Sequence, residues 1–141
     1  MQLTNDLPFD FYDLISVRAW MGMRSVKRVG RSNLWIWLDG EYVSDQTTQF
    51  RAEYKSHPIA WALPDHNVKA TCAGYNSATM LRILASLTKV KWIYSKTRKN
   101  LEVTFGGNSM FMTPTEHLLI QRDLADPLSP QYNFIDLVTT V

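Results

Sequence analysis

Basic and aromatic residues occur together in two stretches of the chain, and this combination is typical of surfaces that contact nucleic acid. In the first stretch four basic residues precede Trp35 and Trp37, and in the second several lysines and an arginine surround Trp92 and Tyr94. Lysine and arginine attract phosphates whatever the base sequence, while aromatic rings stack on unpaired bases. The candidate phosphate contacts are Arg24, Lys27, Arg28, Arg31, Lys91, Lys96, Arg98 and Lys99.

Trp35, Trp37 and Tyr42 are candidates for an aromatic platform. Asp39-Gly40 can occupy the two positive-φ positions of a type I′ turn, which would pair Trp37 with Tyr42 on one face of a short hairpin. Because the other face of this hairpin is also apolar, we expect a helix to cover the aromatic face. The alternative is an exposed platform on which bases or a partner's side chains stack.

The charges are segregated along the chain, although the net charge is only +2. Residues 14–38 hold five basic and no acidic residues, residues 66–101 hold seven basic and no acidic residues, and residues 102–141 hold five acids and one arginine. The simpler interpretation is that these segments neutralise one another within the fold or between copies. The alternative is a basic face that binds an anionic partner.

Common enzyme motifs are missing from the sequence. Gly106-Gly107 is not followed by the lysine and hydroxyl residue of a phosphate-binding P-loop, and there is no GxGxxG, GxSxG, HExxH or CxxC motif. We therefore expect no catalytic residues and no cofactor, and a protein that is not an enzyme.

Cys72 and the histidines leave two other kinds of site to consider. His57, His66 and His117 lack the spacing of metal ligands, although Asp65 and His66 could supply one or two ligands from a turn, so we expect no metal site. Cys72 with a histidine could form a nucleophile and its base. A lone cysteine in an apolar strand is more typical of a buried, inert side chain.

Helical periodicity predicts the helices that would position these residues. Residues 8–21 place acids before an apolar stripe, and residues 76–87 repeat apolar side chains at intervals of three and four after two capping residues. A third helix is predicted to begin at Thr113, because Thr113 and Glu116 have the spacing of a capping box.

Alternating patterns predict a second hairpin over residues 90–105. With residues 97–100 as its loop, Trp92 opposes Phe105, and the aromatic side chains face the core while lysines face solvent. The hairpin around Asp39-Gly40 spans residues 34–44, and further strands are expected at residues 49–55, ending at His57-Pro58, and at residues 68–73.

The length and composition fit one domain spanning residues 1–141. A chain of 141 residues with 45% hydrophobic content can bury a sizeable core. We predict an α+β fold in which an antiparallel sheet of about five strands, built from two hairpins, is packed by two or three helices. No apolar run is long enough to cross a bilayer and the start of the chain does not resemble a signal peptide, so we expect a cytoplasmic protein without a membrane partner.

Together these features favour a small non-enzymatic accessory protein that binds nucleic acid. Its phosphate contacts would come from residues 24–31 and from the hairpin tip at residues 96–99. The alternative is a protein-interaction module, such as an inhibitor, an adaptor or an assembly subunit encoded by a virus or a mobile element. That module would use its basic and acidic faces to bind a protein partner of opposite charge.

Overall fold

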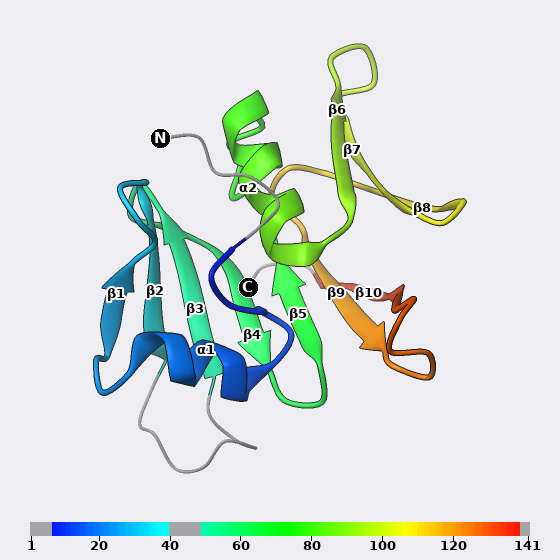
Figure 1. Cartoon of the computed structure of the whole chain (residues 1–141). Coiled ribbons are helices and arrows are strands. Elements are labelled where there is room, and N and C mark those ends of the chain that lie inside the picture. The colour runs from blue at the N-terminus through cyan, green and yellow to red at the C-terminus, as the bar shows by residue number, and fades with distance from the viewer. Residues whose placement is uncertain (1–6, 40–48, 139–141) are drawn as a thin grey trace.

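Two antiparallel sheets and two helices make up the described part of this computed structural model, residues 7–39 and 49–138 (Figure 1). The larger sheet contains β1 (Val26–Arg28), β2 (Leu34–Asp39), β3 (Gln49–Tyr54), β4 (His57–Leu63), β5 (Asn67–Ala70), β9 (His117–Asp123) and β10 (Gln131–Val138), hydrogen-bonded in that order. The predicted α+β class is confirmed, but the described residues form ten strands rather than about five.

One face of the larger sheet, here called the inner face, carries much of the hydrophobic core. Strand alternation turns Leu34 and Ile36 of β2 and Phe50 and Ala52 of β3 to this side, where all four are buried. Helix α1 (Leu14–Met21) lies across the inner face in Figure 1 and buries its apolar side against it.

Helix α1 begins later than the predicted residue 8. Asp13 is its N-cap, and the Asp13 carboxylate accepts a hydrogen bond from the Ile15 N–H at 3.0 Å. Before the cap, the Asp10 carboxylate accepts from the Tyr12 N–H at 3.1 Å, which stabilises a turn instead of a helix. The aromatic residues of this segment are buried in the core without being helical.

Helix α2 (Ala78–Thr88) contacts β4 and β5 of the larger sheet, and it confirms the helix predicted over residues 76–87. The Ser77 hydroxyl caps it by accepting from the Met80 N–H at 3.2 Å, and Lys89 ends it in the left-handed conformation. Of the described helices, neither α1 nor α2 is long and apolar enough to cross a membrane.

The smaller sheet follows α2 directly. It consists of β6 (Lys91–Ser95), β7 (Asn100–Phe105) and β8 (Asn108–Met112), in that order. The predicted hairpin is confirmed, but its register is shifted by two residues, so Trp92 opposes Val103 instead of Phe105. The turn closes earlier than predicted because the Lys99 N–H donates to the Ser95 carbonyl at 2.7 Å. An even shift keeps Trp92 on the same, buried face.

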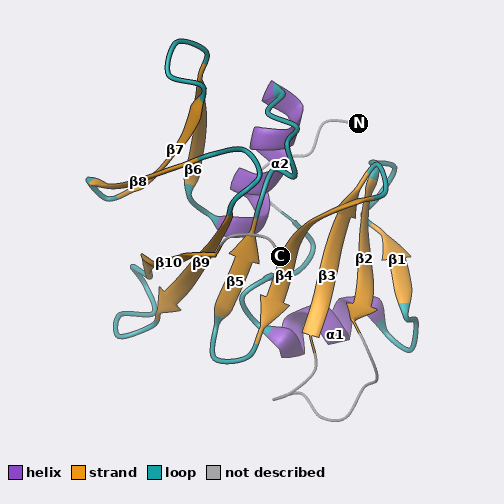
Figure 2. Ribbon diagram, turned by 180° about the vertical axis from the view of Figure 1, so that it is seen from behind, coloured by secondary structure: helices purple, strands orange, loops and turns teal. Residues whose placement is uncertain are grey.

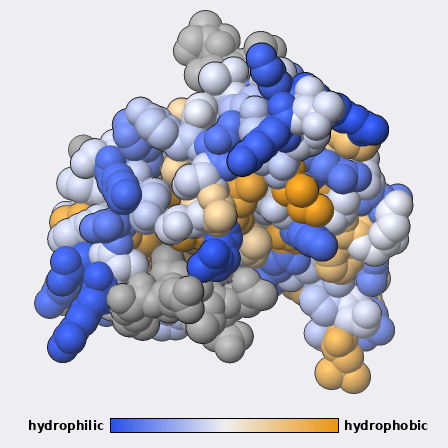
Figure 3. Space-filling view, turned by 90° about the horizontal axis from the view of Figure 1, so that it is seen from above, coloured by the Kyte–Doolittle hydropathy of each residue, from blue (hydrophilic) through white to orange (hydrophobic). Residues whose placement is uncertain are grey.

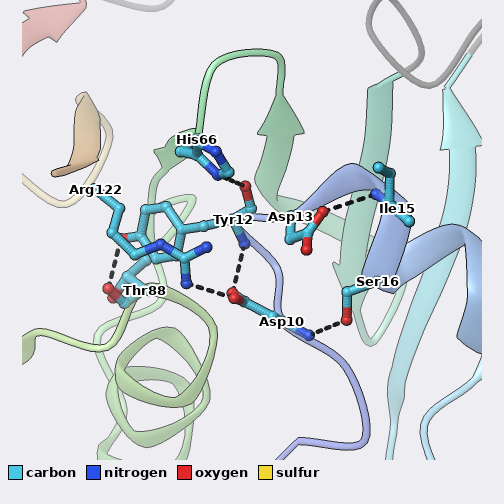
Figure 4. A network of polar contacts seen from close by, with 8 residues as sticks. All are labelled: Asp10, Tyr12, Asp13, Ile15, Ser16, His66, Thr88 and Arg122. Atoms are coloured by element: carbon cyan, nitrogen blue, oxygen red, sulfur yellow. Dashed lines mark hydrogen bonds and ion pairs between the residues drawn. The ribbon is translucent and has the colours of Figure 1, made fainter. Parts of the chain in front are cut away.

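Polar contacts join the segment before α1 to α2 and to β9 (Figure 4). The Tyr12 hydroxyl donates to the Thr88 carbonyl at 2.5 Å, and Asp10 forms an ion pair with Arg122 of β9. A ring nitrogen of His66 lies 3.1 Å from the Tyr12 carbonyl oxygen. Burial raises the pKa of Tyr12 well above its usual value, so its hydroxyl remains a donor at neutral pH.

Strand β2 does not form the hairpin predicted over residues 34–44. Its two neighbours in the sheet are β1 and β3, and Trp37 lies opposite Arg51 of β3 rather than opposite Tyr42. Gly40 and Tyr42 lie outside the described residues. The pattern predicted the strand correctly but not its partner, because a turn signal specifies only local pairing.

A tight turn of two positive-φ residues does occur, at Lys55 and Ser56, where φ is 50° and 70°. It joins β3 to β4, so His57 and Pro58 begin a strand instead of breaking one. Pro58 is tolerated because the register of the two strands is irregular beside Glu53, and a proline needs no ladder hydrogen bond at such a place.

The helix predicted to start at Thr113 is wrong. The Glu116 carboxylate does accept from the Thr113 N–H at 2.7 Å, as in a capping box, but the contact closes a turn that leads into β9. Leu118 and Ile120 are both buried while the residues between and beside them are only half-buried, which is the alternation of a strand.

Candidate functional site

The face of the larger sheet opposite α1, here called the outer face, carries exposed tryptophans. Alternation along β2 places Trp35 and Trp37 there with exposed fractions of 39% and 36%, while Leu34 and Ile36 are buried on the inner face. Figure 2 views the molecule from behind, on the side away from α1. The expectation that a helix covers the tryptophans is therefore wrong, since α1 packs on the other side of the strand.

Aromatic and basic side chains alternate across the outer face from strand to strand. Trp37 of β2 lies opposite Arg51 of β3, Arg51 lies opposite Trp61 of β4, and Trp61 lies opposite Lys69 of β5. Directly opposed residues of antiparallel strands share a face, so these four side chains form one row across the sheet. Four separate segments of the chain build it.

The members of this row contact one another closely. The Arg51 guanidinium lies 5.7 Å from the Trp37 ring centroid, and the Lys69 ammonium lies 4.5 Å from that of Trp61. The His117 ring of β9 stacks on Trp61 with centroids 5.3 Å apart. These are cation–π and stacking distances, so the rings and charges hold each other in place.

A second cation–π pair lies beside the row. The Arg28 guanidinium of β1 lies 5.6 Å from the Trp35 ring centroid, and the two residues are directly opposed. Trp35 and Trp37 also line a hollow of about 440 Å³ that extends to Lys55 and Ser56 in the turn after β3. This volume lies within the range of sites that hold a small molecule or a single nucleotide unit.

The charge of the outer face is unevenly distributed. Arg51 is paired with Asp39 at 2.8 Å and with Glu53 at 2.7 Å, so the three side chains together carry one net negative charge. Arg28 and Lys69, on either side, leave the surroundings of the tryptophans positive. Burial, together with the nearby Lys69 ammonium, lowers the pKa of His117, so His117 is neutral at pH 7.

The four basic residues predicted in the first stretch have different surroundings. Arg28 lies on the outer face, whereas the opposed pair of Lys27 and Ile36 puts Lys27 on the inner side. There the Lys27 ammonium donates to the Trp20 carbonyl at 2.8 Å and lies over the Trp20 ring, so its contacts stabilise the fold. Arg24 and Arg31 are exposed outside the strands.

The second predicted stretch is not brought to the outer face. Lys96, Arg98 and Lys99 are exposed in the turn between β6 and β7, and Lys91 is exposed on β6. In Figures 1 and 2 this turn and β1 lie at opposite sides of the molecule. The two predicted basic clusters therefore form separate surfaces.

Several members of the candidate site were missed in the sequence. They are Arg51, Trp61, Lys69 and His117. The pattern of residues 49–55 does indicate a strand with Arg51 on the polar side, but no local signal aligns it with Trp61. Trp61 lies in the short apolar segment 59–63, whose pattern does not distinguish a strand from a helical turn.

Cys72 has the environment of a structural cysteine. Its thiol is buried and donates to the Pro114 carbonyl oxygen at 3.1 Å. Burial raises its pKa to about 11, which keeps the thiol protonated and unreactive at neutral pH. Within residues 7–39 and 49–138, no group of three or more His, Cys, Asp and Glu side chains is placed to hold a metal ion.

Comparison with known proteins leaves this surface as the main guide to function. Searches with the chain against protein-family models, curated proteins and solved structures gave no match in any of the three.

Proposed function

We propose that this protein binds single-stranded nucleic acid on its outer face. The observation that carries the proposal is the row Trp37, Arg51, Trp61 and Lys69, in which rings and cations alternate on the sheet face opposite α1. Sheet faces that combine aromatic rings with basic residues bind unpaired bases by stacking and the backbone by charge.

The tryptophans would supply the stacking contacts. Trp35 and Trp37 are two residues apart on β2, which separates them by about 7 Å along the strand and lets each ring take its own base. Their cation–π partners hold the rings in position, so little rotamer freedom is lost on binding. The hollow beside them gives a base space to insert.

The basic residues would supply the phosphate contacts. Arg28 and Lys69 lie at the two ends of the aromatic group, whereas Arg51 is already paired with acids. A nucleic-acid strand that crosses the sheet from β1 towards β5 would therefore contact a basic side chain, then aromatic rings, then a second basic side chain. Binding through a few phosphates gives a shallow dependence on salt, about −0.7 in log–log slope per phosphate.

A salt series with a matched pair of variants tests this function. The affinity of a twelve-nucleotide oligothymidine is measured by fluorescence anisotropy for the unaltered protein, Arg28→Ala and Arg98→Ala. We expect Arg28→Ala to weaken binding and to lower the salt slope by about 0.7, and Arg98→Ala to change neither. The proposal fails if the oligonucleotide does not bind at low salt, or if only Arg98→Ala has an effect.

A protein partner for the same face is the second candidate. It is favoured by the net negative charge at the centre of the site, where Arg51 is held by Asp39 and Glu53 beside exposed Trp37. Tryptophan and arginine are the residue types that dominate protein interfaces. Co-purification of a stoichiometric protein without nucleic acid, together with loss of that partner in Trp37→Ala, would support this second function.

A further inference from the structure

The edge of the smaller sheet next to α2 has the form of a peptide-binding groove. Among the described strands β6 is hydrogen-bonded to β7 alone, so its other edge offers backbone N–H and C=O groups for pairing. A hollow of about 380 Å³ lies between this edge and α2, which also contacts β6. It is lined by Ala78, Leu81, Arg82, Ala85, Lys91, Trp92, Ile93 and Tyr94.

The groove combines an apolar base with basic walls. Leu81 and Trp92 are buried, while Arg82 of α2 and Lys91 of β6 are exposed. No acidic residue occurs between His66 and Leu101, so the segment that forms both walls is purely basic. Its charge therefore complements an acidic ligand.

The groove is long enough for an extended segment. A second hollow, of about 580 Å³, shares Ala85 and Lys91 with the first and continues to Gly106 and Gly107 in the turn between β7 and β8. In the view from above, hydrophobic residues show in separate places, near the centre and at the rim, among hydrophilic residues (Figure 3). Only the first hollow follows β6, from Lys91 to Tyr94, which is about 13 Å of strand and fits a short extended segment. The second touches β6 only at Lys91 and passes to Thr104 and Phe105 at the end of β7.

We propose that this groove binds an extended acidic segment of a partner protein, which adds to β6 as a fourth strand of the smaller sheet. Main-chain hydrogen bonds to the edge of β6 give affinity, as they do wherever a peptide extends a sheet. Alternate apolar side chains of the ligand enter the space above Leu81 and Trp92, and its carboxylates pair with Arg82 and Lys91. This site is separate from the outer face and does not depend on the function proposed there.

Selection from a library identifies the ligand class. The probe is a displayed library of random nine-residue peptides, selected on the full chain. We expect enriched peptides to carry at least two acidic residues and alternating apolar residues. Enrichment of peptides without acidic residues, or of none, would overturn the proposal.

Backbone methylation of an enriched peptide tests the added strand itself. One version carries N-methyl groups on the amides that point to one edge of the extended peptide, and the other carries them on the opposite edge. We expect one version to lose at least tenfold in affinity and the other to bind as before, because only one edge pairs with β6. Equal binding by both versions would exclude strand addition.

Matched variants of the protein locate the site. Ala78→Trp fills the groove and Thr79→Trp does not, although both residues are exposed in the first turn of α2. Arg82→Glu with Lys91→Glu reverses the charge of the groove, and Arg98→Glu with Lys99→Glu makes the same change at the hairpin tip. We expect at least a tenfold loss only in the groove variants, with unchanged circular dichroism.

Two further results would show that the groove binds a different ligand. If Arg82→Glu with Lys91→Glu abolishes oligothymidine binding and leaves the enriched peptides bound, the groove takes nucleic acid and the proposal is wrong. If sedimentation shows a dimer that Ala78→Trp dissociates, the occupant is a second copy of this chain instead of a partner.

Discussion

The outer face of the larger sheet and the smaller sheet carry the same residue types, tryptophan with lysine and arginine. They differ in whether the tryptophans or the aliphatic residues are exposed. On β2 the tryptophans are exposed and the aliphatic residues are buried. On β6 Trp92 is only 5% exposed and Ile93 is 41% exposed. Composition alone therefore does not decide whether an aromatic–basic strand is a binding surface; the side on which a helix packs decides it.

The largest contrast between the two regions should appear in stability. We expect Trp92→Ala to lower the free energy of unfolding by about 3–5 kcal/mol, because it removes a buried indole and leaves a cavity. Trp37→Ala should lower it by less, about 1–2 kcal/mol, since that ring keeps 36% of its surface exposed. Urea unfolding of both variants measures the difference, and equal losses would contradict the contrast.

A single buried hydrogen bond should contribute to the stability of the smaller sheet. The Trp92 indole N–H donates to the Thr88 hydroxyl at 2.8 Å, and both residues are buried. Thr88→Val keeps the shape but leaves this N–H without an acceptor, so we expect a loss of about 1–3 kcal/mol in urea unfolding. The control is Thr104→Val on β7, a half-buried position, which should be nearly neutral. A neutral Thr88→Val would mean that the indole finds another acceptor.

The smallest expected effect concerns pH and the outer face. The pKa of His117 is lowered in the folded protein by burial and by Lys69, so the unfolded chain binds a proton at higher pH than the folded chain does. Stability should therefore fall as pH decreases through about 6.5, the ordinary histidine value, and level off below the folded pKa. His117→Gln should reduce this dependence in unfolding curves from pH 7.5 to 5. An unchanged dependence would show that other groups cause it.

The fold class could be predicted because its local signals are strong. Helix α2 follows from a cap and a regular apolar stripe, and the hairpin of β6 and β7 follows from alternation. The helix predicted at Thr113 failed because a capping-box contact also fits a turn before a strand. Strand β4 was missed because Pro58 is a breaking signal unless the register beside it is irregular.

The candidate site was predictable only in part. Trp35, Trp37 and Arg28 were singled out as residue types, but β2 is apolar on both faces and does not itself reveal which face α1 covers. Trp61 and Lys69 join the site through strand pairing between separate segments, and register of that kind is not a local property of the sequence.

The most direct test uses the indole N–H signals of the five tryptophans in a nitrogen-15 NMR titration with oligothymidine, assigned by single substitutions. Binding on the outer face should shift the signals of Trp35, Trp37 and Trp61, because these rings lie there, and should leave the signal of buried Trp92 unmoved. Shifts confined to Trp92 and to the amides of residues 96–99, with the outer-face indoles unmoved, would contradict it.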